Sequence, residues 1–173
     1  RIHLLSELFF LQDYIKGLWS QNWSLAVEEQ FYIILPLLFI LLARVRKSKD
    51  QVFRLIPIIF IFIGLTCLGL RILTHITMPY TDITHHFPFH LRIDSLFFGV
   101  LISYFYHYQS VKLMKIVKRF KNLFLGLGVT LFIPAFIFAP GTAFIHTIGL
   151  TMFYFASGLI LLAIIETDFK KKY

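Results

Sequence analysis

The sequence contains five long apolar stretches, and they restrict the fold classes that this chain can adopt. A helix needs about 20 apolar residues to cross a bilayer, and these stretches reach or approach that length. Only 15% of the 173 residues are charged and 58% are hydrophobic, whereas soluble domains carry roughly 25% charged residues. We therefore expect an all-α fold, a polytopic transmembrane helix bundle with about five spans. The spans are expected near residues 27–43, 52–73, 93–108, 122–139 and 143–165.

Positive charges lie in alternate segments between these stretches. Thirteen of the 17 Lys and Arg residues follow the first, third and fifth stretches, which the positive-inside rule places in the cytoplasm. The segments 16–26, 74–92 and 140–142 are then expected outside. The expected organisation is an interfacial or extracytoplasmic segment over residues 1–26, the transmembrane bundle over 27–165 and a cytoplasmic basic tail over 166–173.

The net charge of +8 does not by itself indicate nucleic-acid binding. Basic loops beside spans are explained by topology and by anionic lipid, and no nucleic-acid recognition module accompanies them. The single cysteine, Cys67, excludes an internal disulfide. The chain opens with Arg1 and has no signal-peptide pattern, so we expect it to be a fragment of a longer protein.

A first polar cluster stands where the first apolar stretch begins. Ser24 is placed to cap a helix, with Glu28 and Glu29 near the positive end of the helix dipole. Ser24, Glu28 and Tyr32 are spaced four residues apart and so share one helix face. Capping, together with Trp23 in an interfacial aromatic belt, would explain this pattern. Two adjacent carboxylates exceed what a cap requires, and they also indicate a hydrogen-bonding or proton-transfer role.

A second polar cluster leads into the third apolar stretch. His90 and Asp94 are four residues apart, so Asp94 is expected to orient the imidazole. Arg92 lies on a different face, where it could meet Glu28 as an ion pair or provide an anion-binding point. A helix-joining salt bridge without further function would also explain these charges, since intramembrane charges usually pair.

Histidines and an aspartate in the same region have the side chains that zinc prefers. No His-Glu-x-x-His pattern and no cysteine ligand accompany them. We therefore expect no metal site, and no P-loop, dinucleotide fingerprint or serine elbow is present. The residues considered are His75, Asp82, His85, His86 and His90, whereas His3, His107 and His146 are expected to be interfacial or packing residues.

The run Trp-Ser-Leu-Ala-Val-Glu-Glu-Gln-Phe-Tyr over residues 23–32, continuing to Leu35-Pro36-Leu37, closely resembles the signature of the acyltransferase-3 family. These proteins are multispan O-acyltransferases that modify envelope polysaccharides, lipopolysaccharide, peptidoglycan and some small molecules. The segments Phe9–Tyr14 and Arg92–Gly99 are similar to further family segments, in the same order. The ten-residue run is specific because it combines Trp, two Glu, Gln and Tyr.

The resemblance implies a fold of about ten transmembrane helices, of which this chain would be the middle portion. It also implies a bacterial inner-membrane enzyme that uses acyl-CoA, with acetyl-CoA as the expected donor, and a hydroxyl acceptor such as a cell-envelope glycan. No bound cofactor is expected. The family's first helix carries an Arg and, about ten residues later, the His taken as catalytic base. This sequence has neither motif before Trp19, and none of its histidines matches that position.

Acyl transfer needs a base for the hydroxyl proton and donors that stabilise the developing oxyanion. Under the resemblance, Glu28 is expected to support proton handling and Arg92 to stabilise negative charge. Substrate contacts are expected from Trp23, Ser24, Tyr32, His90 and Asp94.

Two other functions fit the same residues. In an ion- or proton-coupled transporter, Glu28, Arg92 and Asp94 would form the path, although the sequence shows no repeated halves. A non-catalytic membrane fragment that lacks the catalytic first helix is the other alternative.

Overall fold

A computed structural model describes residues 2–15, 19, 21–45 and 52–172 of this chain, with residues 2, 45 and 166–172 described by their backbone alone. The structure is 82% helical with no strand among these residues, which confirms the all-α class. Within the described ranges, four helices are long and apolar enough to cross a membrane: Trp23–Arg44, Ile56–Thr77, Ser110–Ile137 and Ile145–Ile165. By the length and composition of these helices, the chain is a membrane protein.

The chain forms two compact units, Arg1–Phe97 and Phe98–Tyr173. The first unit holds α1 (Ile2–Leu8), α2 (Trp23–Val45), α4 (Ile56–Thr77), α5 (Asp82–His85), the 3₁₀ turn η1 (Phe89–Leu91) and the start of α6 (Ile93–Tyr108). Pro57 lies in the first turn of α4. A proline is tolerated there because the first N–H groups of a helix have no partner within it.

A tight turn ends α1 and directs the following residues back across the first unit. Phe10 has φ 53°, and it is the one described non-glycine residue with a positive φ. The N–H of Leu11 donates to the Ser6 carbonyl and that of Phe10 to the Glu7 carbonyl, as in a Schellman C-cap. A left-handed residue that is not glycine costs roughly 1–2 kcal/mol, so tertiary contacts must hold this turn.

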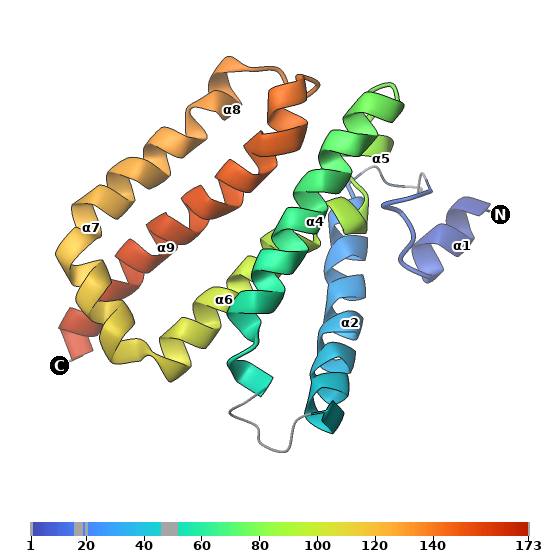
Figure 1. Cartoon of the computed structure of the whole chain (residues 1–173). Helices are drawn as coiled ribbons and strands as arrows, with labels where there is room; N and C mark the ends of the chain where they lie inside the picture. The colour runs from blue at the N-terminus through green and yellow to red at the C-terminus, as the bar shows by residue number, and fades with distance from the viewer. Residues whose placement is uncertain (1, 16–18, 20, 46–51, 173) are drawn as a thin grey trace. The chain divides into compact units, whose positions relative to one another are not determined.

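The second unit contains the rest of α6, α7 (Ser110–Phe132), α8 (Pro134–Ile137), the π-helical turn η2 (Ile145–Gly149) and α9 (Leu150–Lys172). In this unit α7 and α9 lie side by side (Figure 1). Gly128 permits their close approach, because a Cβ there would lie 2.6 Å from Ile160 Cγ1 and 3.1 Å from the Ala156 carbonyl oxygen. Phe132 stacks on Phe153 across the same pair of helices.

Two helices differ from the expected spans. The basic segment 112–121, expected as a loop, is helical, since α7 begins at Ser110 and continues through a kink at Phe120. The expected span 93–108 is the 16-residue helix α6, which is shorter than the four candidate membrane spans. Some of the basic residues expected in the cytoplasm are not described. Residues 46, 47 and 49 lie outside the described ranges, and residues 170–172 are described by their backbone alone.

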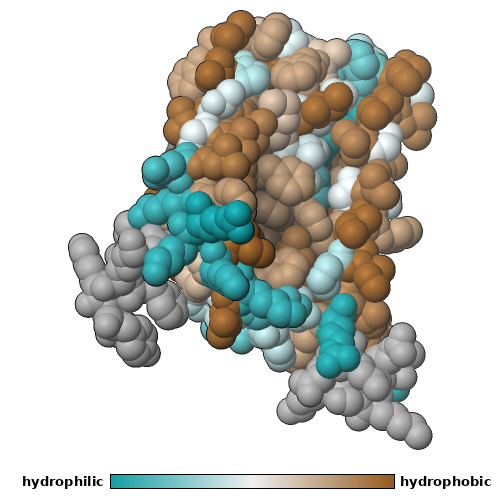
Figure 2. All heavy atoms as spheres, turned by 60° about the vertical axis from the view of Figure 1, so that its left-hand side comes forward, coloured by the Kyte–Doolittle hydropathy of each residue, from teal (hydrophilic) through white to brown (hydrophobic). Residues whose placement is uncertain are grey.

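Large apolar side chains face outward along these helices. Ile76 is 74% exposed, Phe62 72% and Phe136 89%. Hydrophobic residues cover most of the face shown in Figure 2. A soluble monomer rarely exposes so extended an apolar surface, so lipid is the expected solvent for these helices.

Candidate functional site

A buried ion pair anchors residues 88–94, which contain η1 and the first two residues of α6 and which we call the 88–94 turn. Arg71 on α4 donates from Nε and Nη2 to the Leu91 carbonyl, at 2.8 and 2.6 Å. Its Nη2 also donates to Asp94 Oδ1 at 2.6 Å, and both side chains are fully buried. The pair therefore fixes the start of α6 to α4.

Asp13, in the segment that follows α1, also binds the 88–94 turn. Its Oδ2 accepts the N–H of Phe89 at 3.1 Å, and its Oδ1 accepts from Gln30 Nε2 at 2.9 Å. Gln30 Nε2 also donates to the carbonyl of Phe10 at 2.6 Å. Burial raises the pKa of Asp13, although these hydrogen bonds to Phe89 and Gln30 act to lower it. One carboxylate thus joins the segment after α1, helix α2 and the 88–94 turn.

Glu7 organises the residues that precede α2. Its Oε2 accepts from Gln12 Nε2 at 2.7 Å and from Asn22 Nδ2 at 2.9 Å. These bonds connect α1 to the residue just before α2. Glu7 and Asp13 thus each tie the residues around α1 to other parts of the first unit.

His90 pairs with a tyrosine rather than with Asp94. Its Nδ1 lies 2.9 Å from the Tyr14 hydroxyl, and the two rings stack with centroids 5.7 Å apart. Partial desolvation lowers the pKa of His90 and raises that of Tyr14. The expectation that Asp94 orients His90 is therefore wrong: His90 lies in η1, before α6 begins, and Asp94 is held by Arg71.

Arg92 belongs to a stack of planar groups. Its guanidinium carbon lies 5.3 Å from the centroid of the Trp23 ring, and Trp23 stacks on Phe87 with centroids 4.7 Å apart. Burial, and next the neighbouring Arg71, lower the pKa of Arg92 to about 10, so the group stays charged at neutral pH. Its Nη1 is buried and has no hydrogen-bond partner in the part of the chain that the structure describes. A cation is thus held beside Trp23 with one donor available to an oxygen acceptor.

The expected site residues separate into two groups. Trp23, His90, Arg92 and Asp94 all lie at the 88–94 turn or in contact with it. Glu28 is exposed instead, and no ion pair joins it to Arg92 among the described residues. The expected Glu28–Arg92 contact is therefore wrong, because the guanidinium lies over Trp23.

The other two residues of the first polar cluster are also exposed. Ser24 Oγ donates to the Gln21 carbonyl at 3.3 Å, and α2 already begins at Trp23, so Ser24 is not the cap. Tyr32 is 59% exposed. Substrate contacts by these two residues stay predictions.

Three residues of the site did not stand out in the sequence: Arg71, Asp13 and Gln30. Arg71 had a usable signal, since it is the one charged residue of the 22-residue helix α4 and a lone intramembrane charge is a functional candidate by default. Asp13 and Gln30 lie in the segments 9–14 and 23–32, but the sequence does not show that they contact each other, because only the folded chain brings them together.

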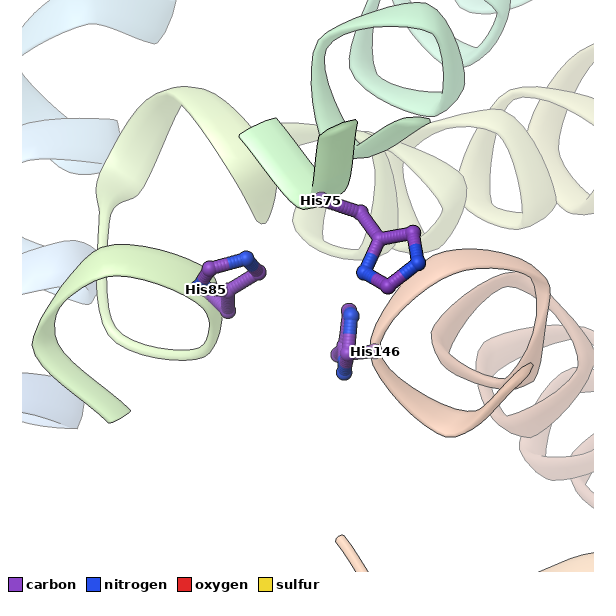
Figure 3. Close-up of side chains that lie close together, drawn as sticks. All are labelled: His75, His85 and His146. Carbon is purple, nitrogen blue, oxygen red and sulfur yellow. The ribbon is translucent and has the colours of Figure 1, made fainter. Parts of the chain in front are cut away.

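Two of the histidines with zinc-ligand side chains also meet in the first unit. His75 in the last turn of α4 and His85 at the end of α5 lie close together (Figure 3). A ring nitrogen of each lies within 4.8 Å of one on the other. Burial, and next His75, lower the pKa of His85. His86 instead packs its edge against Trp23.

Comparisons with protein-family models, curated proteins and solved structures found no match to this chain.

Proposed function

We propose that this chain is part of a membrane O-acyltransferase, which transfers an acyl group from acyl-CoA to a hydroxyl of a cell-envelope glycan or a similar acceptor. One observation carries the proposal. The three segments that resemble the acyltransferase-3 family, residues 9–14, 23–32 and 92–99, share one set of contacts. Asp13 binds Gln30, and Arg92 lies over Trp23. Such contacts between segments that are distant in sequence are expected if the segments form one functional site.

Arg92 supports the proposal chemically. In acyl transfer the acceptor oxygen attacks the thioester carbonyl carbon, the C–S bond breaks, and the hydroxyl proton passes to a base while CoA leaves as the thiol. Negative charge develops on the carbonyl oxygen, and a fixed cationic donor stabilises it. The buried Nη1 of Arg92 is such a donor. Glu28 is exposed, and the resemblance assigns the main base to a His motif that this sequence does not contain.

The proposal includes the bacterial inner membrane as the location, with the basic segments in the cytoplasm. The 88–94 turn and the start of α2 would then face the outer side, where a glycan acceptor would bind. The acyl-CoA donor would approach from the cytoplasm.

The test is acyl transfer by membranes that contain the product of the complete reading frame, supplied with radiolabelled acetyl-CoA. We expect label in an envelope glycan with wild type and a loss of about 100-fold or more with Arg92→Gln, the size seen when an oxyanion donor is removed. Glu28→Gln should also lower the rate. Arg54→Gln, at an exposed arginine outside the site, is the control, and it should leave transfer unchanged at equal expression.

Two outcomes would count against the proposal in different ways. Full transfer by Arg92→Gln and Glu28→Gln would keep the enzyme class and remove both residues from it. Absence of transfer from wild type with acetyl-CoA and with longer acyl-CoA donors would overturn the enzyme. Ion flux through reconstituted vesicles, sensitive to Asp94→Asn, would then favour the transporter.

A further inference from the structure

His85 is buried and contacts several neighbouring side chains. It is 1% exposed and ends the single-turn helix α5. Thr81 and Thr84 form a capping box at the start of that helix, and the Thr84 hydroxyl lies 2.7 Å from His85 Nδ1. The ring of Tyr80 packs on the imidazole with centroids 5.3 Å apart. The position and orientation of this ring are therefore set by its neighbours.

The contact at Nδ1 is of the kind that metal-binding histidines make. A ligating histidine almost always donates its second ring N–H to a nearby oxygen, which fixes the tautomer and aims the other nitrogen at the metal. With Nδ1 engaged by Thr84, Nε2 is the nitrogen of His85 that would bind an ion.

His75 supplies a second imidazole that can adjust. It is exposed, and it lies in the last turn of α4, where the helix dipole favours a cation. Two metal–nitrogen bonds of about 2.0–2.1 Å each allow ligand nitrogens up to about 4 Å apart. The nitrogens of His75 and His85 already lie within 4.8 Å, so a small rotation of the exposed ring is sufficient.

We propose that His75 and His85 form a binding site for one divalent transition-metal ion of the zinc, copper and nickel class, with water completing the coordination. Imidazole is a preferred ligand for these ions. The fixed ring of His85 would give the site its geometry, and the exposed ring of His75 would give the ion access from water. This site is independent of acyl transfer, so either proposal can fail without the other.

Copper(II) is the direct probe because its paramagnetic spectrum counts coordinated nitrogens. With less than one equivalent of Cu²⁺ added to the purified protein in detergent, we expect nitrogen couplings from two imidazoles. His75→Ala should leave one imidazole and weaken Cu²⁺ and Zn²⁺ binding by about tenfold or more, the scale of losses when a metal site is disrupted. His86→Ala and His107→Ala are the matched histidine controls, and neither should change the spectrum or the affinity.

The buried residue needs its own control. His85→Gln should abolish binding, but a buried substitution can also unfold the protein, so its elution volume and helix content must match wild type. Because His75 is exposed, the His75→Ala variant tests the metal site if His85→Gln does not fold. Equal affinity in His75→Ala and wild type would overturn the site, as would an equal loss in His86→Ala or a wild-type spectrum without imidazole couplings.

Discussion

At the scale of single residues, the Arg71–Asp94 pair has consequences beyond its own bond. Both groups are fully buried, and Arg71 also satisfies the Leu91 carbonyl at the point where the chain enters α6. Removing one partner of a buried pair leaves a charge without compensation, whereas replacing both by apolar residues is often neutral. The pair should therefore behave very differently under single and double substitution.

Arg71→Met should destabilise the protein by about 3–5 kcal/mol, because it strands Asp94 in the apolar interior. Arg71→Met combined with Asp94→Leu should recover most of this loss. Unfolding in mixed micelles measures both effects. Arg54→Met, at an exposed arginine before α4, should change stability by no more than about 0.5 kcal/mol. A single variant as stable as wild type would show that the pair is dispensable.

His90 should make stability depend on pH. Its pKa in the folded chain lies below its ordinary value of 6.5 because the ring is partly removed from water. As pH falls below 6.5, the unfolded chain takes up a proton that the folded chain does not, so stability decreases until the folded pKa is reached. His90→Gln should remove this part of the decrease in a titration of unfolding between about pH 7.5 and 5. An unchanged slope in the variant would contradict the assignment.

At the scale of helices, the sequence predicts which segments are helical better than it predicts the contacts between them. Apolar length alone locates α2, α4 and α9, because a chain in lipid must satisfy its backbone hydrogen bonds internally. It misses the basic half of α7, since lysines there interrupt the apolar run that marks a span. The 88–94 turn could not be predicted, because its shape depends on the Phe89 N–H donating to Asp13 and on Arg71 donating to the Leu91 carbonyl.

Gly158 should be essential to the packing of α9 against α6. A Cβ there would overlap Phe98 Cε1 and lie 2.9 Å from Ile102 Cδ1. Gly158→Ala should thus destabilise the protein by about 1–3 kcal/mol, the usual cost of overpacking. Gly126→Ala on α7 is the control: nothing lies within 4 Å of a Cβ there, so the better helix former should stabilise by up to about 1 kcal/mol. If both substitutions changed the free energy of unfolding in the same direction, the packing of α9 against α6 at Gly158 would be contradicted.

At the scale of the whole molecule, the alternation of basic segments predicts the sidedness of the chain. Lys112 follows α6 and Gly141 precedes η2, and both are exposed. In a Cys67→Ala background, Gly141→Cys should react with an impermeant maleimide added outside intact cells, and Lys112→Cys should react only after the membrane is opened. Labelling of both from the same side would show that α7 and α8 do not cross the membrane.

The short helix α6 has a consequence for how the protein is made. Sixteen residues span about 24 Å, less than the roughly 30 Å of a bilayer core, and Asp94 in its first turn adds a cost to membrane insertion if it is unpaired. Helix α4 leaves the ribosome first and carries Arg71, the group that removes this cost. Insertion of α6 therefore depends on the order of synthesis, with an earlier helix acting as an internal assembly partner for a later one.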